Sequence, residues 1–259
     1  MNNLIYSQLT EYYVQQGIYP EQFSCRHQDF CRSFAYQNDM TETKMSMVGS
    51  CYGTQYPKIV VISLDPPFEN QGAFVKPEQR TTVYISTSHE ADDYNIRRPN
   101  PHWAMTQIII KDILCLFGYK ARMGSAVVNE SYAGLRIENV TRYFAHVNAA
   151  KCSMNNVGKR QAHRQVHQRC SNAYLRDELA ILQPDFLVTQ GNDANTVLST
   201  LLMGRLFLAN ALPTAQTVTL GGKAVLWLPM RHPARSIAKI RKDWPFYVHA
   251  IQEWKSLGW

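Results

Sequence analysis

The chain has 259 residues, of which 45% are hydrophobic and 18% charged, a composition that argues against intrinsic disorder. No apolar run is long enough to cross a membrane and the polar start is not a signal peptide, so we expect a cytoplasmic globular protein without membrane contact. The net charge of +7 favours a polyanionic partner, with nucleic acid first, although many soluble proteins are mildly basic for other reasons.

The N-terminal part, residues 1–56, is polar, rich in aromatic residues and contains Cys25 and Cys31. The apolar, β-branched run at 59–64 then predicts a strand that is buried on both faces. It ends at Asp65-Pro66-Pro67, because proline cannot continue a central strand. Residues 66–101 are polar and too numerous for an ordinary connection, which indicates either a functional insertion or secondary structure that the pattern does not reveal.

Strands and helices alternate through the rest of the chain. We predict helices over 103–117, over 163–182, from Gly191 onward and over 240–256, and strands over 142–148, 185–190 and 223–229. This alternation predicts an α/β fold, a single domain over 1–259 with a central, mostly parallel four-stranded sheet flanked by helices. In such folds, ligands bind at the carboxyl ends of the strands.

Three polar segments, 65–67, 148–152 and 231–233, leave three of the predicted strands, and we expect them to converge. One reaction that converging groups of this kind can catalyse is the release of a pyrimidine base from deoxyribose. This reaction needs a carboxylate beside the sugar cation and a hydrogen-bond donor to the base anion. It also needs an amide that reads the base and an aromatic ring that stacks on it. Asp65, His232 and Asn148 suit the first three roles, with Phe74 or Phe68 as the ring. Each residue alone is equally compatible with a turn, a cap or a structural role.

Basic residues form two blocks that can follow phosphates or simply be solvated helix faces. The first block contains Lys159, Arg160, His163, Arg164, His167 and Arg169, and the second contains Arg231, Arg235, Lys239, Arg241 and Lys242.

Six cysteines are present, and disulfides are not expected in a cytoplasmic protein, which leaves metal binding, burial or catalysis. Cys115 lies within the apolar helix and is expected in the core. Cys51 lies in Gly49-Ser-Cys-Tyr-Gly53, which imitates a nucleophile elbow but precedes a strand, so a turn is expected there.

The motifs, taken in order over roughly 57–236, resemble those of the iron–sulfur branch of the uracil-DNA glycosylase superfamily. Ser63-Leu-Asp-Pro-Pro67 resembles the superfamily's Gly-Gln-Asp-Pro-Tyr, where this branch usually has Gly-Glu-Ala-Pro-Gly. Asn148-Ala-Ala-Lys-Cys152 resembles Asn-x-x-Lys-Cys. Cys170-Ser-Asn-Ala-Tyr-Leu175 resembles Cys-x-x-Tyr-Leu with one extra residue, Phe186–Ala194 resembles the strand and turn that follow, and His232-Pro-Ala234 resembles the final His-Pro-x.

The resemblance implies a monofunctional DNA glycosylase that flips a pyrimidine out of DNA and leaves an abasic site, and we expect a monomer. It makes Asp65 the water-activating carboxylate, Asn148 the base reader and His232 the stabiliser of the leaving base. We expect Arg235 to contact the DNA backbone or act as a wedge. A module that binds modified or single-stranded DNA without cutting it, and an unrelated iron–sulfur redox protein, are the alternatives.

The resemblance also implies a [4Fe–4S] cluster on Cys25, Cys31, Cys152 and Cys170, with residues 1–56 as the cluster-binding segment. Zinc on the same thiols is the alternative. Five residues, instead of two, separate Cys25 from Cys31, and Cys51 is a spare candidate.

The substrate depends on Pro67, which stands where the cluster-free uracil enzymes carry a Tyr that rejects thymine. The smaller ring, with the polar insertion, favours a bulky C5-modified pyrimidine such as the glucosylated hydroxymethylcytosine of phage DNA, and hence antiviral defence. Pro67 is equally comparable to the small Gly of the iron–sulfur branch, which removes uracil in DNA repair.

Overall fold

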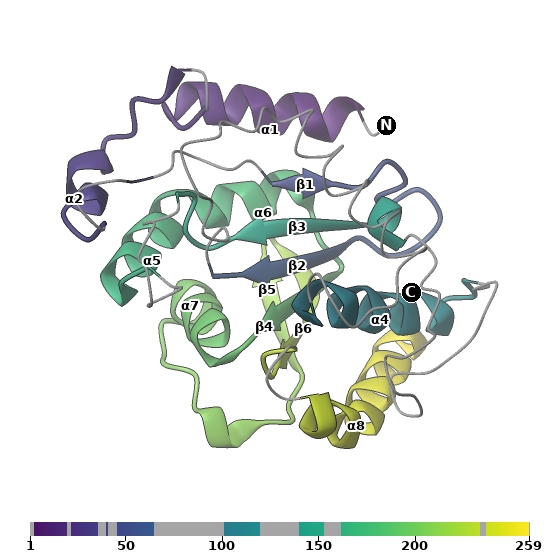
Figure 1. Cartoon of the computed structure of the whole chain (residues 1–259). Coiled ribbons are helices and arrows are strands. Elements are labelled where there is room, and N and C mark those ends of the chain that lie inside the picture. Colours follow the sequence, from purple (N-terminus) through teal and green to yellow (C-terminus); the bar gives the residue numbers. More distant parts are fainter. Residues whose placement is uncertain are drawn as a thin grey trace.

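A computed structural model of the chain describes residues 3–19, 22–35, 40, 46–64, 101–119, 140–152, 162–233 and 237–258. These residues form an α/β fold on a mixed six-stranded sheet with strand order β1-β3-β2-β4-β6-β5 (Figure 1). The strands are β1 Met47–Val48, β2 Ile59–Ser63, β3 Phe144–Asn148, β4 Phe186–Gln190, β5 Gln216–Leu220 and β6 Lys223–Met230.

The four predicted strands are all present and form the parallel centre of the sheet, β3-β2-β4-β6. Every residue of β2, β3 and β4 is buried, as continuous apolar runs predict. The predicted strand count is nevertheless wrong, because β1 and β5 add antiparallel edges. The strand β1 is only two residues long, and β5 is an edge strand with exposed Thr residues, so neither produces a strong apolar run.

Helices cover both faces of the sheet, and the alternation of side chains along each strand decides which face a residue serves. In β2, Ile59 and Val61 pack with α4 (Pro101–Leu116) and α8 (Ile237–Ser256). Val60 and Ile62 pack on the other face with α1 (Asn3–Gln15), α6 (Arg176–Leu182) and α7 (Asn192–Met203). Two apolar cores therefore enclose the parallel strands.

The helix predictions are confirmed with small differences at the ends: α4 begins two residues earlier than expected and α8 three residues earlier. Gly118 follows α4 with φ +90°, a conformation that favours glycine. The remaining short elements are α2 (Gln28–Arg32), α5 (Arg164–Cys170), and the 3₁₀ turns η3 (Val140–Tyr143) and η5 (Ala209–Ala211). No helix in the described ranges is long and apolar enough to cross a membrane.

The helix predicted over 163–182 is continuous, but its middle, η4 (Ser171–Leu175), is a π-helix. This turn coincides with the one residue that the sequence has in excess of Cys-x-x-Tyr-Leu. A π-turn holds about one residue more than an α-turn and is usually a single bulge within an α-helix. The extra residue is therefore absorbed locally, and Cys170, Tyr174 and Leu175 are all buried.

Candidate functional site

The four parallel strands end in one row, which we call the carboxyl edge. Ser63 of β2 pairs with Asn148 of β3, and Gln190 of β4 pairs with Met230 of β6. Gln190 lies one position beyond the pair Ile62–Thr189, so all four residues are in register. Asn148 and the segment that carries His232 therefore lie at the same edge, with β2 and β4 between them, as the sequence predicts.

Polar side chains collect at the carboxyl edge on the face covered by α4. His146 Nε2 and Ser63 Oγ are 2.8 Å apart, and Gln190 Nε2 donates to Thr106 Oγ1 of α4 at 2.7 Å. Asn148 is 3% exposed. Buried polar groups at strand ends are held in fixed orientations by such hydrogen bonds, which suits the recognition of a polar ligand.

His232 lies against His102, which is in the first turn of α4, with ring centroids 5.0 Å apart. Burial, followed by the charge of His232, lowers the pKa of His102 to about 4, and the side chain of Gln190 acts in the opposite direction. His102 is consequently neutral at neutral pH. The pair of imidazoles brings hydrogen-bonding groups from α4 and from the segment after β6 side by side.

The turn after β4 lies against His232, and it is the backbone conformation of Gly191, rather than a lack of space, that favours glycine there. Gly191 has φ +101°, and a Cβ built on it would lie 3.5 Å from His232 Cβ. The backbone N–H of Gly191 donates to the carbonyl of Met230 at 2.9 Å, and Asn195 Nδ2 donates to the same carbonyl at 3.2 Å. These bonds fix the end of β6, and hence the start of the segment that carries His232.

Five residues predicted for the site lie outside the described residues. They are Asp65, Pro67, Phe68, Phe74 and Arg235, together with positions 66–100 of the predicted insertion. The last described residue before this gap is Leu64 of the first motif. It directly follows β2 and therefore lies at the carboxyl edge.

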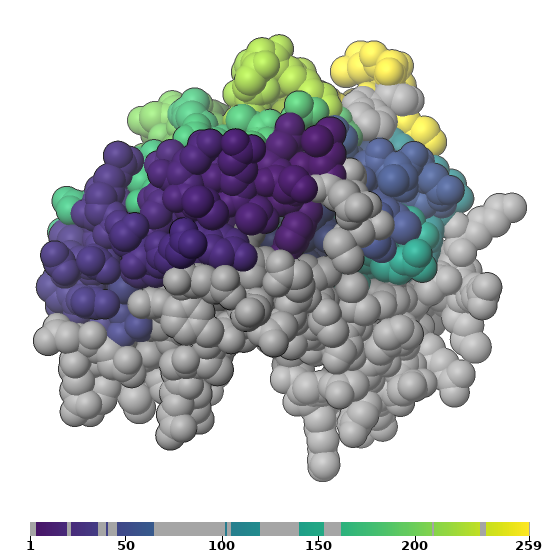
Figure 2. All heavy atoms as spheres, turned by 90° about the horizontal axis from the view of Figure 1, so that it is seen from above, coloured from purple at the N-terminus to yellow at the C-terminus, as the bar shows by residue number. Residues whose placement is uncertain are grey.

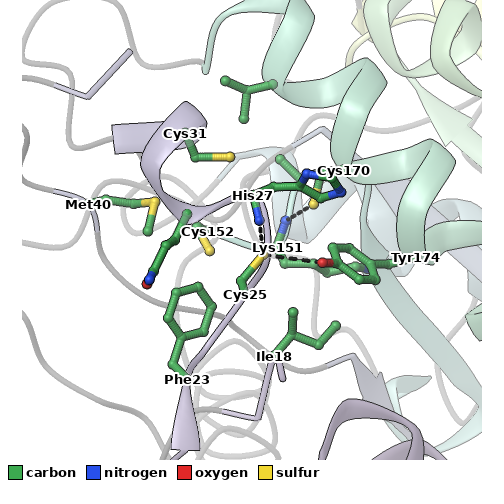
Figure 3. Close-up of a pocket in the computed structure, with 13 residues that line it drawn as sticks. Ile18, Phe23, Cys25, His27, Cys31, Met40, Lys151, Cys152, Cys170 and Tyr174 are labelled. Atoms are coloured by element: carbon green, nitrogen blue, oxygen red, sulfur yellow. Dashed lines mark hydrogen bonds between the residues drawn. The ribbon is translucent and has the colours of Figure 1, made fainter. Parts of the chain in front are cut away.

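The four predicted cysteine ligands line one pocket, which we call the cysteine cage (Figure 3). Cys25 and Cys31 come from the N-terminal segment, Cys152 follows β3, and Cys170 ends α5. Each is 6–7% exposed. Apolar side chains complete the walls, including Ile18, Phe23, Met40 and Val166. Cys25 and Cys170, which are 145 positions apart in the sequence, thus face a common, largely dry space.

Hydrogen bonds reach the sulfur atoms of the cage from the surrounding protein. The backbone N–H of Lys151 donates to Cys170 Sγ at 3.2 Å, and that of His27 donates to Cys25 Sγ at 3.4 Å. The hydroxyl of Tyr174 lies 3.2 Å from Cys25 Sγ. Donors of this kind stabilise thiolates and commonly surround metal-bound sulfur.

Burial, followed by the nearby Cys170 and Cys25 sulfurs, raises the pKa of the Cys31 thiol to about 12, against the opposing charge of Arg169. Burial likewise raises the pKa of Cys170 to about 11, against the opposing charge and N–H of Lys151. Ionising several of these thiols together requires a compensating positive charge, which a metal centre supplies as it displaces the protons.

The donor set fits an iron–sulfur cluster, which uses four cysteine thiolates. In the described ranges, no group of three or more His, Cys, Asp or Glu side chains is arranged to hold a metal ion. A single zinc ion would need all four sulfurs within about 2.3 Å of one point.

Behind the cage lies a buried polar network that the sequence did not reveal. Lys151 Nζ contacts Glu178 Oε2 of α6 and donates to the carbonyl of Asn148 at 2.7 Å. The other carboxylate oxygen of Glu178 accepts from Tyr13 of α1 and, at 3.1 Å, from Ser46 Oγ. Complete burial raises the pKa of Glu178 well above its ordinary value. The network connects α1, α6 and the end of β3 beside the cage.

The two remaining cysteines do not line the cage. Cys51 lies in a turn, as expected, with its sulfur 3.6 Å from Arg142 Nη2, so its role as a spare ligand is not supported. Cys115 was expected in the core, and that prediction is wrong, because the side chain is exposed near the end of α4. The apolar sequence around it hides which side of the helix faces solvent.

The two basic blocks differ in the structure. In the second, Arg231 pairs with Asp243 of α8 at 2.8 Å and serves to anchor that helix. In the first, His167 is buried and His163 caps α5, whereas Arg164 and Arg169 are exposed. Lys159 and Arg160 lie outside the described residues.

Sequence reasoning missed His102, Gln190 and Glu178 as site residues. Gln190 is the last residue of a predicted strand, which is a usable signal for an edge site. His102 precedes the predicted helix start by one residue and lies next to the insertion, and Glu178 occupies an ordinary helical position whose burial no local pattern announces.

Comparison with known proteins adds no family assignment. No protein-family model matches the sequence, and no curated protein matches it. The functional argument therefore rests on the residues themselves.

Proposed function

We propose that the protein is a monofunctional DNA glycosylase that hydrolyses the N-glycosidic bond of a flipped pyrimidine and carries a [4Fe–4S] cluster. The observation that carries this proposal is the segment 148–152. Its first residue, Asn148, ends β3 at the carboxyl edge, and its last, Cys152, lines the cysteine cage. The base-reading and cluster-binding motifs of the resemblance are thus one continuous, buried unit.

The described part of the carboxyl edge supplies two of the groups that the reaction needs. Asn148 offers an amide with both a donor and an acceptor, which can read the edge of a uracil or a cytosine. His232 donates to the oxygen of the departing base, where negative charge develops. The neighbouring His102 is neutral near pH 7, so it adds no positive charge beside this hydrogen-bond donor.

The third group is Asp65, to which the resemblance assigns the stabilisation of the sugar cation and the orientation of water. It is the residue after Leu64 in the sequence. The bond between C1′ of the sugar and N1 of the base breaks, the base leaves with the electron pair, and water adds to C1′ and gives up a proton. No covalent enzyme intermediate is required.

The cluster would be held by Cys25, Cys31, Cys152 and Cys170, and its role would be structural, tying the N-terminal segment to α5 and to the end of β3.

The enzyme proposal is tested by counting abasic sites in uracil-containing and glucosylated DNA treated with the wild-type protein, Asp65→Asn or His232→Ala. Removing one preorganised donor, as in His232→Ala, costs on the order of 10²–10³ in rate. Asp65→Asn removes the charge that stabilises the sugar cation, so both variants should lose cleavage and retain DNA binding. Full activity of Asp65→Asn would refute its assignment. Tight binding without abasic sites in any DNA would favour the non-catalytic binding module.

The base itself is decided by a side-by-side assay on uracil-containing, unmodified and glucosylated DNA. We propose a C5-modified pyrimidine, glucosylated hydroxymethylcytosine in phage DNA, because Pro67 replaces the bulky Tyr of the uracil enzymes. Release of the glucosylated base would support an antiviral role. Efficient release of uracil, with glucosylated DNA untouched, would overturn the modified-base proposal and leave a repair enzyme.

A further inference from the structure

The outer side of the cysteine cage forms an open hollow between α2 and α5, which we call the α2–α5 surface. It is lined by Arg26, His27 and Phe30 from the N-terminal segment and by Gln165, Gln168 and Arg169 from α5. The N-terminal segment forms one continuous stretch of this side of the molecule, in purple and indigo in Figure 2. None of the residues that line the hollow is an Asp or a Glu.

Planar side chains form a series across this surface. The guanidinium of Arg169 lies 3.7 Å above the ring of Phe30. Phe30 in turn contacts Phe34, with centroids 5.0 Å apart, and Phe34 stacks on His163 at 4.6 Å with an interplanar angle of 15°. A guanidinium centred over an aromatic ring is held in place by cation–π attraction, and its N–H groups can still donate to an oxyanion.

The arginines of the α2–α5 surface have no ion-pair partner among the residues that the structure describes. Arg26 and Arg169 are exposed, and within the described ranges neither forms an ion pair. By contrast, Arg231 of the other basic block is paired with Asp243. Exposed arginines around a hollow whose described lining includes no carboxylate favour an anionic ligand, and aromatic rings interleaved among them are typical of nucleic-acid surfaces.

We propose that the α2–α5 surface binds the sugar–phosphate backbone of DNA next to the extruded base, with Arg26 and Arg169 as the phosphate contacts. This inference rests on the proposed function for the identity of the polyanion. Its location follows from the cage: Cys25 directly precedes Arg26, Cys170 directly follows Arg169, and Cys152 joins the same cage to Asn148 at the carboxyl edge. The cluster-binding segment would then also hold the DNA in position.

The test is DNA binding, measured by the anisotropy of a short fluorescein-labelled duplex and of its single strand over a range of salt. Replacing both Arg26 and Arg169 by Ala should weaken binding about tenfold and reduce the salt slope by about 0.9 for each lost phosphate contact on duplex DNA. The matched control replaces Arg142 and Lys255, which are exposed on other elements, and removes the same net charge. It should leave affinity nearly unchanged.

A second variant distinguishes the loss of DNA contacts from damage to the cysteine cage. Gln165→Glu with Gln168→Glu adds two negative charges on exposed positions of the same surface and leaves both arginines in place. It should weaken DNA binding while iron content and thermal stability stay as in the wild type. If Arg26→Ala/Arg169→Ala and the Glu variant both bind like the control, the surface does not contact DNA.

The two proposals fail in different ways. If the wild-type protein forms abasic sites but none of these variants changes affinity or salt slope, the inferred surface is wrong and the proposed function stands. If the wild-type protein neither binds nor cleaves any of the DNAs, the proposed function fails, and the surface proposal fails with it.

Discussion

Lys151 and Glu178 form an ion pair whose side chains are only 1% and 0% exposed. Charges so deeply buried are costly unless each is paired and fully hydrogen-bonded. Glu178 receives additional donors from Tyr13 and Ser46, and Lys151 also bonds the carbonyl of Asn148. The pair therefore fixes the backbone of the residue to which base reading is assigned, and Lys151 is a positioning residue.

Lys151→Met should lower the free energy of unfolding by about 3–5 kcal/mol, because it leaves a buried carboxylate without its cation. Adding Glu178→Gln to Lys151→Met should recover part of this loss, since the amide keeps an acceptor for Tyr13 and carries no charge. Denaturant unfolding of the two single variants and the double variant measures this coupling. Strictly additive losses would show that the two groups do not interact as described.

His102 makes the stability of the protein depend on pH in a defined direction. Its pKa falls from 6.5 to about 4 in the folded chain, so below about pH 6.5 the unfolded chain binds a proton that the folded chain does not. Stability should therefore be unaffected by His102 at pH 7 and decline between about pH 6.5 and 4, by about 2–3 kcal/mol in total.

His102→Gln should remove this decline. The measurement is the difference in unfolding free energy between His102→Gln and the wild type, at pH 7 and at about pH 4.5. The variant should gain stability relative to the wild type at the lower pH. The same difference at both pH values would contradict the assigned burial of a neutral imidazole.

Single residues were predictable where their chemistry is restricted to few roles. Four cysteines in an expected cytoplasmic setting have few alternatives to metal binding, and all four meet in one pocket. Cys115 and Glu178 show the limit. A cysteine in an apolar helix is exposed and a glutamate in a polar helix is buried, because tertiary packing decides which side of a helix faces the core.

Among the elements, the parallel strands were predictable because burial on both faces leaves a continuous apolar run. The helix α1 was not predicted, since its polar and aromatic sequence buries only part of one side, with Leu9, Tyr12 and Tyr13. The edge strands β1 and β5 were missed because a short strand and an alternating strand resemble loops in the sequence. The shared carboxyl edge of Asn148 and the segment with His232 followed correctly from the prediction that the central strands are parallel.

The π-turn η4 offers a test of how the extra residue is accommodated. Deleting the exposed Asn172 should convert the π-turn to an α-turn and keep Cys170 and Tyr174 on the cage side, at a cost of about 1 kcal/mol or less. Deleting the exposed Gln168 of α5 should cost far more, because it rotates the buried Val166 by about 100° relative to Cys170. Thermal unfolding and iron content report both effects. Equal losses in the two deletions would contradict this interpretation.

The elements that carry the four cysteines of the cage lead to a prediction about the iron content of the protein. Purified anaerobically, the protein should contain iron and sulfide and absorb broadly in the visible region. Substituting Cys25, Cys31, Cys152 or Cys170 by Ser should abolish or strongly reduce the iron content, whereas Cys51→Ser and Cys115→Ser should retain it. Unchanged iron in Cys170→Ser would show that the ligand set is wrong. Stoichiometric zinc without sulfide would replace the cluster by a zinc site.

At the scale of the whole molecule, three clusters of buried side chains each stabilise a different part of the protein. Two sandwich the parallel sheet and keep its carboxyl edge in register. The third contains the four cysteines, with Tyr13, Ile18 and Tyr174, and joins the N-terminal segment to α5 and the end of β3. The carboxyl edge is thereby supported from one side by the sheet and from the other by the cage.

The most direct test of the central claim is to measure the free base released from DNA, by mass spectrometry, after incubation with the anaerobically purified protein. We predict release of an intact pyrimidine, either uracil or the glucosylated hydroxymethylcytosine, in amounts equal to the abasic sites formed, and none with His232→Ala. DNA that is bound with high affinity while no free base is released from any of these substrates would contradict the account.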